Sequence, residues 1–194
     1  MPNNSQLLHY QHFNKKLKMK NLLFLTLFFT NYFIFGQTKT PPTIKEILLN
    51  QLKTTHNKKD WFVPINDALA GLTPEQANWK DGSGNHSVGQ LATHLIFWNS
   101  RELANFKGEK LEKFNGNNDE TFTKFDKNSW TEIVKKIDIL QTDWEKAIEN
   151  ADEEKLKSWY ETIANISTHN AYHTGQIIFV RKLQGSWNAE KGVK

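Results

Sequence analysis

The spacing of two histidines near the carboxyl end of the chain constrains its fold more than any other feature. His169 and His173 lie four residues apart in a stretch with helical apolar periodicity, Ser167 to Gln184. On an α-helix, side chains at this spacing share a face, with Cβ atoms about 5–6 Å apart. The same face also carries Thr162, Ile166, Gln176, Ile177, Val180 and Gln184. The pattern therefore predicts that both imidazole rings face the core.

Two imidazoles that face the core need partners, because a buried polar nitrogen without a hydrogen bond costs about 1–3 kcal/mol. A divalent metal ion would use both rings in their neutral form, and a catalytic site of the zinc type would add a third protein ligand and keep one position open. The alternative is a pair of core histidines bonded to the backbone or to each other. The spacing alone does not decide between the two.

The composition indicates one globular domain without cysteine chemistry. The chain has 194 residues and no cysteine, so disulfides, thiolate metal sites and a cysteine nucleophile are excluded. Residues 1–36 contain four lysines and no acidic residue, and these lysines account for the whole formal net charge of +4. The rest of the chain is neutral, which indicates neither a nucleic-acid surface nor a patch for anionic membranes.

Residues 1–36 have the pattern of a secretory signal peptide. A largely apolar run of fourteen residues, Leu22 to Phe35, follows lysines and ends at a small residue. The run is shorter than the roughly 20 apolar residues of a membrane span, although an uncleaved membrane anchor is the alternative. Met19 would begin a more typical signal peptide, so residues 1–18 are interpreted as a possible non-native extension. We expect an exported protein, periplasmic or secreted, whose mature domain is residues 37–194.

Helical periodicity dominates the mature domain. The periodic stretches run from about Thr43 to Leu72 with an interruption near residues 57–63, from Ser87 onward, from Ser129 to about Asn150, and from about Glu161 to Gln184. Ser87 with Gln90 and Ser129 with Glu132 have the spacing of capping boxes. A short helical turn is expected at Pro74–Ala77, and no stretch alternates like a strand. We predict an all-α four-helix bundle with a long connection, residues 107–128, between the second and third helices.

A third histidine, His94, lies on the second predicted helix. Its helical face also carries Gln90, Leu91, Phe97, Trp98 and Arg101, which predicts a core-facing ring. Bundles commonly build metal sites from side chains of facing helices. Two other histidines are expected to take no part in a site. His56, in a polar stretch, is predicted to be solvated, and His86, just before the second helix, is predicted to be structural.

The stretches that contain these three histidines resemble the DinB/YfiT-like family of metal-binding four-helix bundles, which is unrelated to the DNA polymerase of the same name. HSVGQLATHLIFW (His86 to Trp98) is similar to the family's second-helix ligand motif. HNAYHTGQIIFVRKLQGSW (His169 to Trp187) is similar to its fourth-helix HxxYHxGQ signature. The resemblance extends over essentially all of Thr43 to Lys194.

The resemblance implies a three-histidine metal site at His94, His169 and His173. The expected cofactor is a divalent cation, Zn, Ni or Mn, since nitrogen ligands alone do not select among them. The family includes metal-dependent hydrolases and enzymes that transfer low-molecular-weight thiols such as bacillithiol or mycothiol. Relatives often carry a histidine after the tryptophan of the interrupted first helix. Here Phe62 follows Trp61, which puts any role at that position in doubt.

We expect a metal-dependent hydrolase that activates water, because the export signal is unusual for thiol transferases, whose thiol cosubstrates are cytosolic. A thiol S-transferase and a non-catalytic metal-binding protein are the alternatives. The substrate is expected to be a small molecule, with no nucleic acid and no membrane contact in the mature form, and a homodimer is compatible with the sequence. Residues 107–128 are interpreted as a cover over the open metal position.

Three further polar residues are candidates for catalysis, and each has a structural alternative. Gln176 is expected to orient a water or the substrate, or else to hold a ligand by a hydrogen bond. Arg101 is expected to bind an anionic group, or else to pair with an acid such as Glu102. Tyr172 is expected to donate its hydroxyl hydrogen, or else to pack. Gly175, in mid-helix, indicates a close helix contact. No residue is identified as a general base.

Overall fold

The structure of the protein is a computed structural model that describes residues 40–123 and 127–192. The expected signal segment, residues 1–36, lies outside this part of the chain. Within the described residues, no helix combines the length and the apolar character that crossing a membrane requires. Residues from Pro42 onward form one compact unit.

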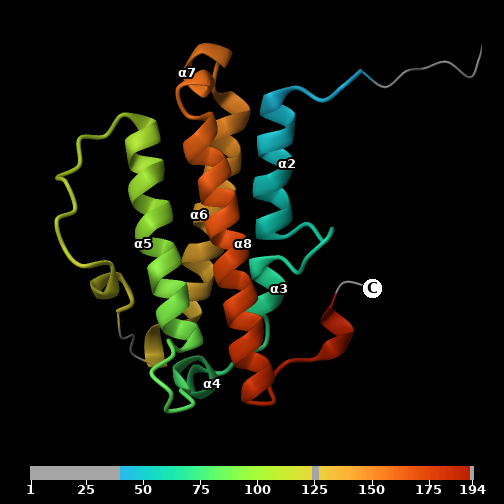
Figure 1. Cartoon of the computed structure of the whole chain (residues 1–194), viewed down its shortest axis with the longest axis vertical. Helices are drawn as coiled ribbons and strands as arrows, with labels where there is room; N and C mark the ends of the chain where they lie inside the picture. The colour runs from blue at the N-terminus through green and yellow to red at the C-terminus, as the bar shows by residue number, and fades with distance from the viewer. Residues whose placement is uncertain (1–39, 124–126, 193–194) are drawn as a thin grey trace, which may run out of the picture. The chain divides into compact units, whose positions relative to one another are not determined.

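Four long helices build this unit, and they confirm the all-α bundle. They are α2 (Ile44–His56), α5 (Val88–Lys107), α6 (Trp130–Asn150) and α8 (Tyr160–Leu183). Helix α5 packs against α6 and α8, and α2 packs against the same two helices. Figure 1 shows that α2 and α8 run in the opposite direction to α5 and α6. Because α5 and α6 are neighbours that run in parallel, the chain between them must return along the length of α5, which explains the long connection.

Short elements join the long helices. They are α3 (Ile65–Leu69), α4 (Pro74–Asn78), α7 (Glu153–Lys157) and the single 3-10 turns η1 (Asn118–Thr121), η2 (Lys127–Ser129) and η3 (Ala189–Lys191). The predicted interruption of the first helix is confirmed, since α2 ends at His56 and α3 begins at Ile65. The capping box of Ser87 and Gln90 at the start of α5 is also confirmed.

The capping box predicted at Ser129 is wrong. Ser129 precedes α6 but has helical backbone angles, φ −93° and ψ −3°, and its side chain makes no capping hydrogen bond. The reason is the 3-10 turn η2, which leads directly into α6. An N-cap residue needs an extended backbone for its side chain to reach the first free N–H groups, and the turn removes that geometry.

The interior contains two apolar clusters. One includes Leu95 of α5 and Ile177 of α8, and the other includes Trp144 of α6 and Ile163 of α8. Together they contain buried apolar side chains from all four long helices. Burial of this kind is the dominant favourable contribution to folding.

A polar layer lies between the two clusters. Asn99 of α5, Gln141 of α6 and Asn170 of α8 are 0–3% exposed, and we call them the amide layer. Asn99 donates to Asn170 Oδ1 at 2.8 Å, and its own Oδ1 accepts from Gln141 and Asn170 at 3.2 Å each. Asn170 also donates to Gln141 Oε1 at 3.2 Å. The three amides therefore satisfy one another and tie three helices together.

The prediction that His56 is solvated is wrong. Its ring is 1% exposed at the end of α2. Nδ1 lies 2.7 Å from Glu145 Oε1, and Nε2 lies 2.9 Å from Asp138 Oδ1, which also accepts from Asn66. Hydrogen bonds from His56, the larger effect, and from Asn66 lower the pKa of Asp138. Two acidic residues seven positions apart on α6 thus give each ring nitrogen of His56 a partner. This satisfies the buried ring although the neighbouring residues in the sequence are polar.

The close helix contact predicted at Gly175 is also wrong. Gly175 is exposed in the middle of α8, and a Cβ added to it would meet no heavy atom within 4 Å. The structure shows no packing reason for a glycine at this position.

Gly175→Ala is therefore expected to stabilise the protein by about 0.5–1 kcal/mol, because alanine is the better helix former and the space is open. Urea unfolding followed by circular dichroism measures the change. The matched control is Ala171→Gly, one turn earlier on α8, which should destabilise by a similar amount. A loss of stability in Gly175→Ala would show that the position is packed after all.

Candidate metal centre

Three histidines from two helices converge on one point. His94 comes from α5, and His169 and His173 come from α8, which packs against it. The Nε2 atom of His169 lies 3.1 Å from Nε2 of His94 and 3.0 Å from Nε2 of His173. One ligand atom from each of the three rings lies within 4.8 Å of the others. The prediction that these rings come together is confirmed. His173 and His94 are buried, at 6% and 2% exposed, whereas His169 is half-buried.

The connection after α5 orients His94. Nδ1 of His94 lies 2.5 Å from the hydroxyl oxygen of Thr121, which itself donates to the carbonyl of Asn118 at 2.6 Å. Because the hydroxyl hydrogen is already engaged, the oxygen accepts, so Nδ1 of His94 carries the proton. The Nε2 atom of His94 therefore presents a lone pair toward the other two rings.

Gln176 orients His173 in the same way. Its Oε1 accepts from Nδ1 of His173 at 2.6 Å, and its Nε2 donates to the hydroxyl of Tyr172 at 3.3 Å. The proton on Nδ1 leaves a lone pair on Nε2 of His173. Of the two roles considered for Gln176, the geometry matches that of holding a ligand, since both ends of its amide are engaged.

The donor set fits a divalent cation. Two lone pairs point at His169 Nε2, and that atom can donate a hydrogen to only one of them. A cation bound by all three Nε2 atoms would satisfy every lone pair at once. Histidine ligands held by a hydrogen bond at the other ring nitrogen are the usual arrangement around protein-bound metals.

Comparison with known families agrees with this geometry. Residues 65–177 match the model of the DinB superfamily, and this span contains all three histidines. The chain belongs to the DinB superfamily. No curated protein and no solved structure matches it.

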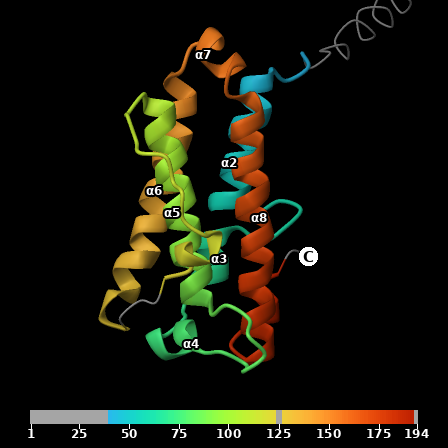
Figure 2. The same ribbon diagram turned by 60° about the vertical axis from the view of Figure 1, so that its left-hand side comes forward.

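Sequence reasoning missed two residues of this DinB-superfamily site, both in the connection after α5. Thr121 orients His94, and the ring of Phe122 stacks on His94 with centroids 3.9 Å apart. His86 stacks on the opposite side of Phe122 at 3.8 Å, which agrees with a structural role. Figure 2 shows η1, which ends at Thr121, in front of α5. Part of the predicted cover thus contacts the site.

Burial favours the neutral form of the three rings. It lowers the pKa of His94 to about 3, with smaller contributions from His173 and His169, and it lowers the pKa of His169 to about 4. The pKa of His173 is also lowered by burial, and the hydrogen bond to Gln176 opposes the shift. Neutral imidazole is the form that binds a metal ion.

The metal-free protein is expected to lose stability as the pH falls from about 6.5, the ordinary pKa of histidine, toward 4. In this window the unfolded chain takes up protons that the folded rings, with pKa values of about 3 and 4 for His94 and His169, do not. Urea unfolding at pH 7, 6, 5 and 4.5 measures the slope. His169→Gln, which cannot titrate at that position, should give a shallower slope, and an equal slope would contradict the assignment.

Arg101 does not face the three histidines. Its guanidinium donates to the backbone carbonyl of Glu112, and it lines a separate cavity with Phe97. The buried face of α5 passes through Leu95, Asn99 and Leu103, so Arg101 points toward the connection instead of the core. The prediction that it lies on the inner stripe is wrong.

A cavity of about 480 Å³ adjoins the histidines on the side of His169. Trp98 and Glu102 of α5, Asn118 of η1 and Asn165 of α8 line it together with His169. His94 and His173, by contrast, are covered by Phe122 and Gln176. The cavity therefore gives small molecules access to His169.

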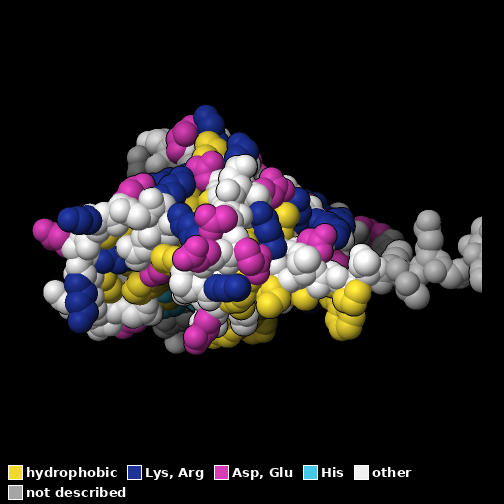
Figure 3. Space-filling view, turned by 90° about the horizontal axis from the view of Figure 1, so that it is seen from above, with side chains coloured by type: hydrophobic (Ala, Val, Ile, Leu, Met, Phe, Trp, Pro, Cys, Tyr) yellow, Lys and Arg dark blue, Asp and Glu magenta, His cyan; other side chains and the backbone are white. Residues whose placement is uncertain are grey.

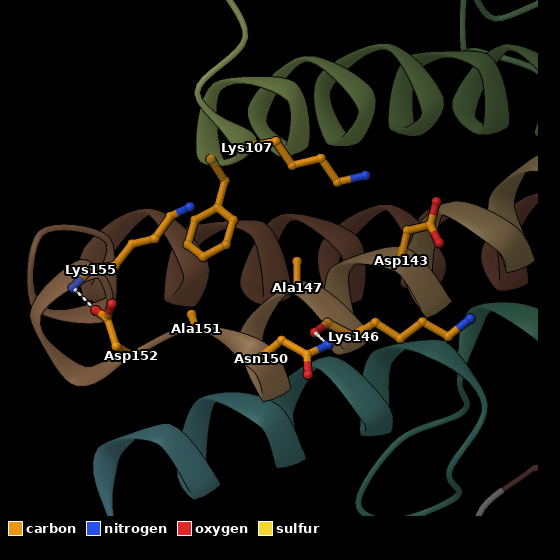
Figure 4. Close-up of a pocket in the computed structure, with 9 residues that line it drawn as sticks. Lys107, Asp143, Lys146, Ala147, Asn150, Ala151, Asp152 and Lys155 are labelled. Atoms are coloured by element: carbon orange, nitrogen blue, oxygen red, sulfur yellow. Dashed lines mark hydrogen bonds between the residues drawn. The ribbon is translucent and has the colours of Figure 1, made fainter.

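A second cavity, of about 550 Å³, lies where α5, α6 and α7 meet. Figure 4 shows Lys107, Lys146 and Lys155 around it, together with Asp143 and Asp152. No histidine lines it. Seen from above in Figure 3, lysines and acidic side chains are interspersed. This cavity offers no metal ligand set and no field of a single sign.

Proposed function

We propose that the protein is an exported, divalent-metal-dependent hydrolase whose metal ion is bound by His94, His169 and His173. The observation that carries the proposal is the convergence of three Nε2 atoms, two of which have their tautomer set by Thr121 and Gln176. Zn, Ni and Mn all accept nitrogen ligands of this kind. The amino-terminal pattern supports export.

Three neutral ligands suit catalysis better than a structural role, because structural zinc sites are normally closed by a fourth protein ligand. When bound, the ion supplies a full double charge that polarises a carbonyl or phosphoryl oxygen and favours ionisation of water. The two apolar clusters already give the bundle a core without a metal ion.

The chain's own residues hold and supplement the site. Thr121 and Gln176 fix the rings of His94 and His173, while Phe122 keeps water from one side of His94. Tyr172 is 62% exposed, and its hydroxyl oxygen accepts from Gln176. Its hydroxyl hydrogen has no acceptor among the residues that the structure describes, so it can be offered to a substrate oxygen. Tyr172→Phe is expected to lower turnover about a hundredfold, as for a lost proton donor, with unchanged metal content.

The test combines metal removal with a substrate screen. Chelation of the mature protein should leave helical circular dichroism nearly intact and abolish turnover of whichever ester, amide or phosphoester the screen finds. If the metal-free protein unfolds and no metal gives activity, the metal has a structural role or is carried by the protein, and the hydrolase proposal is wrong. If turnover is found only in thiol conjugation, the protein is a thiol S-transferase and not a hydrolase.

The export part of the proposal has its own test. Amino-terminal sequencing of the protein from its native host should find a chain that begins near Gln37. A cytoplasmic chain that retains Leu22 to Phe35 would contradict it.

A further inference from the structure

We propose that the cavity beside His169 binds an organic cation, and that the substrate is an amide or ester carrying a primary ammonium group at a distance from its reacting carbonyl. The inference deepens the proposed hydrolase and rests on it for the reacting bond. Binding of the cation itself depends only on the side chains that line the cavity.

The charge of the cavity is negative. Glu102 is its single charged side chain, and no lysine or arginine lines it. The carboxylate has one neighbour, Asn105 Nδ2 at 3.5 Å, and it forms no ion pair within the described residues. Arg101, the adjacent residue, donates to a backbone carbonyl instead. A half-buried carboxylate without a cation favours a positively charged ligand.

Helix α5, which carries Glu102, also contributes an aromatic ring to the cavity. Trp98 lies one turn before Glu102, and its indole N–H donates to Asn118 Oδ1 at 3.2 Å. The rings of Phe97 and Phe114 meet it edge-on, with centroids 5.1 and 5.6 Å away. Trp98 is therefore held in place before any ligand arrives. Tryptophan is the best aromatic partner for a cation, worth about 0.5–1 kcal/mol where exposed.

Neutral acceptors complete the lining. Thr162 and Asn165 contribute a hydroxyl and an amide from α8, whereas Trp98 and Glu102 come from α5. An ammonium group has three N–H donors and no acceptor. One carboxylate with several neutral oxygens matches that pattern. An anionic ligand, by contrast, would be repelled by the carboxylate and would find no lysine or arginine in the lining.

The position of Glu102 sets where the charge lies on the substrate. Glu102 follows His94 by eight residues on α5, which is about 12 Å along the helix axis. His169 also lines the cavity, and its Nε2 lies 3.1 Å from Nε2 of His94. A ligand that contacts both Glu102 and these rings has its ammonium group separated from the carbonyl by an extended chain, as in an ω-aminoacyl group, and not on the adjacent carbon.

The experiment titrates the metal-free protein with hexylammonium and with hexan-1-ol at pH 7.5 and low salt. Binding is followed by calorimetry and by the indole N–H signals in NMR spectra. Hexylammonium should bind at least about tenfold more tightly than the alcohol, as expected for a hydrogen-bonded charge. E102Q should remove that difference, and W98L should weaken hexylammonium about threefold.

The matched control is E161Q, which removes an exposed carboxylate in the first turn of α8 that does not line the cavity. It should leave the preference for hexylammonium unchanged. Equal binding of the two probes, no binding of either, or an E102Q protein that behaves like the parent would overturn the inference. Metal content is measured on each preparation before the metal is removed, and metal rebinding is measured on the metal-free protein. A protein that binds metal but not hexylammonium refutes the cation site alone, and the reverse result refutes the metal site alone.

Discussion

Replacing His173 by alanine is expected to abolish stoichiometric metal binding. The ring supplies one of three converging Nε2 atoms, and the two that remain, from His94 and His169, cannot hold a divalent ion against solvent at the same affinity. The expected loss exceeds about a hundredfold, since even removal of a residue that only supports a ligand costs about 10–100-fold. Elemental analysis gives the metal content, and competition with a chromophoric chelator gives the affinity.

Two further variants make this result specific. His86→Phe removes a nearby histidine but keeps a ring to stack on Phe122, so it should bind metal like the parent. Gln176→Leu removes the acceptor of His173 Nδ1 and should weaken binding by about 10–100-fold. Unchanged metal content and affinity in His173→Ala would show that the site is misassigned.

The parts of the site that the sequence predicts are those encoded by local helical periodicity. His169 and His173 share one turn of α8, so their common direction follows from a spacing of four residues. The inward direction of His94 on α5 follows from the same periodicity. The resemblance to the family predicts that the histidines of the two helices form one site. Periodicity cannot predict this, because periodicity contains no information about which helix faces meet.

Helical periodicity predicts the wrong direction for Arg101. His94 and Arg101 are seven residues apart, yet the buried face of α5 runs through Asn99 and Leu103. His94 therefore lies near one edge of that face, and Arg101 lies beyond it. A helical wheel cannot locate the edge of a stripe without knowing the neighbouring helices.

Contacts between distant segments account for the other errors. Thr121 and Phe122 belong to an aperiodic connection, so nothing local marks them as contacts of His94. His56 is buried because Asp138 and Glu145, more than eighty residues away, lie within hydrogen-bonding distance of its two ring nitrogens. Polar character in the sequence predicted exposure, but the hydrogen bonds decide the burial.

The amide layer is a further feature that sequence reasoning missed, and it gives the second large prediction. Asn99→Leu is expected to destabilise the protein by about 3–5 kcal/mol. Leucine keeps the branching of the side chain, but it removes the acceptor of Gln141 Nε2 and of Asn170 Nδ2, and the donor to Asn170 Oδ1. Each buried group left without a partner costs about 1–3 kcal/mol. Urea unfolding followed by circular dichroism measures the loss.

A double-mutant cycle separates the loss of the network from a loss of packing. Asn170→Leu alone should also destabilise, but the double variant should lose at least about 1 kcal/mol less than the sum of the two, because each change removes partners that the other leaves unpaired. Asn105→Leu, half-buried on α5 outside the layer, should change stability by no more than about 0.5 kcal/mol. Strictly additive losses would mean that Asn99 and Asn170 do not depend on each other. The amides would then not be the connection that holds α5 against α8 beside the three histidines.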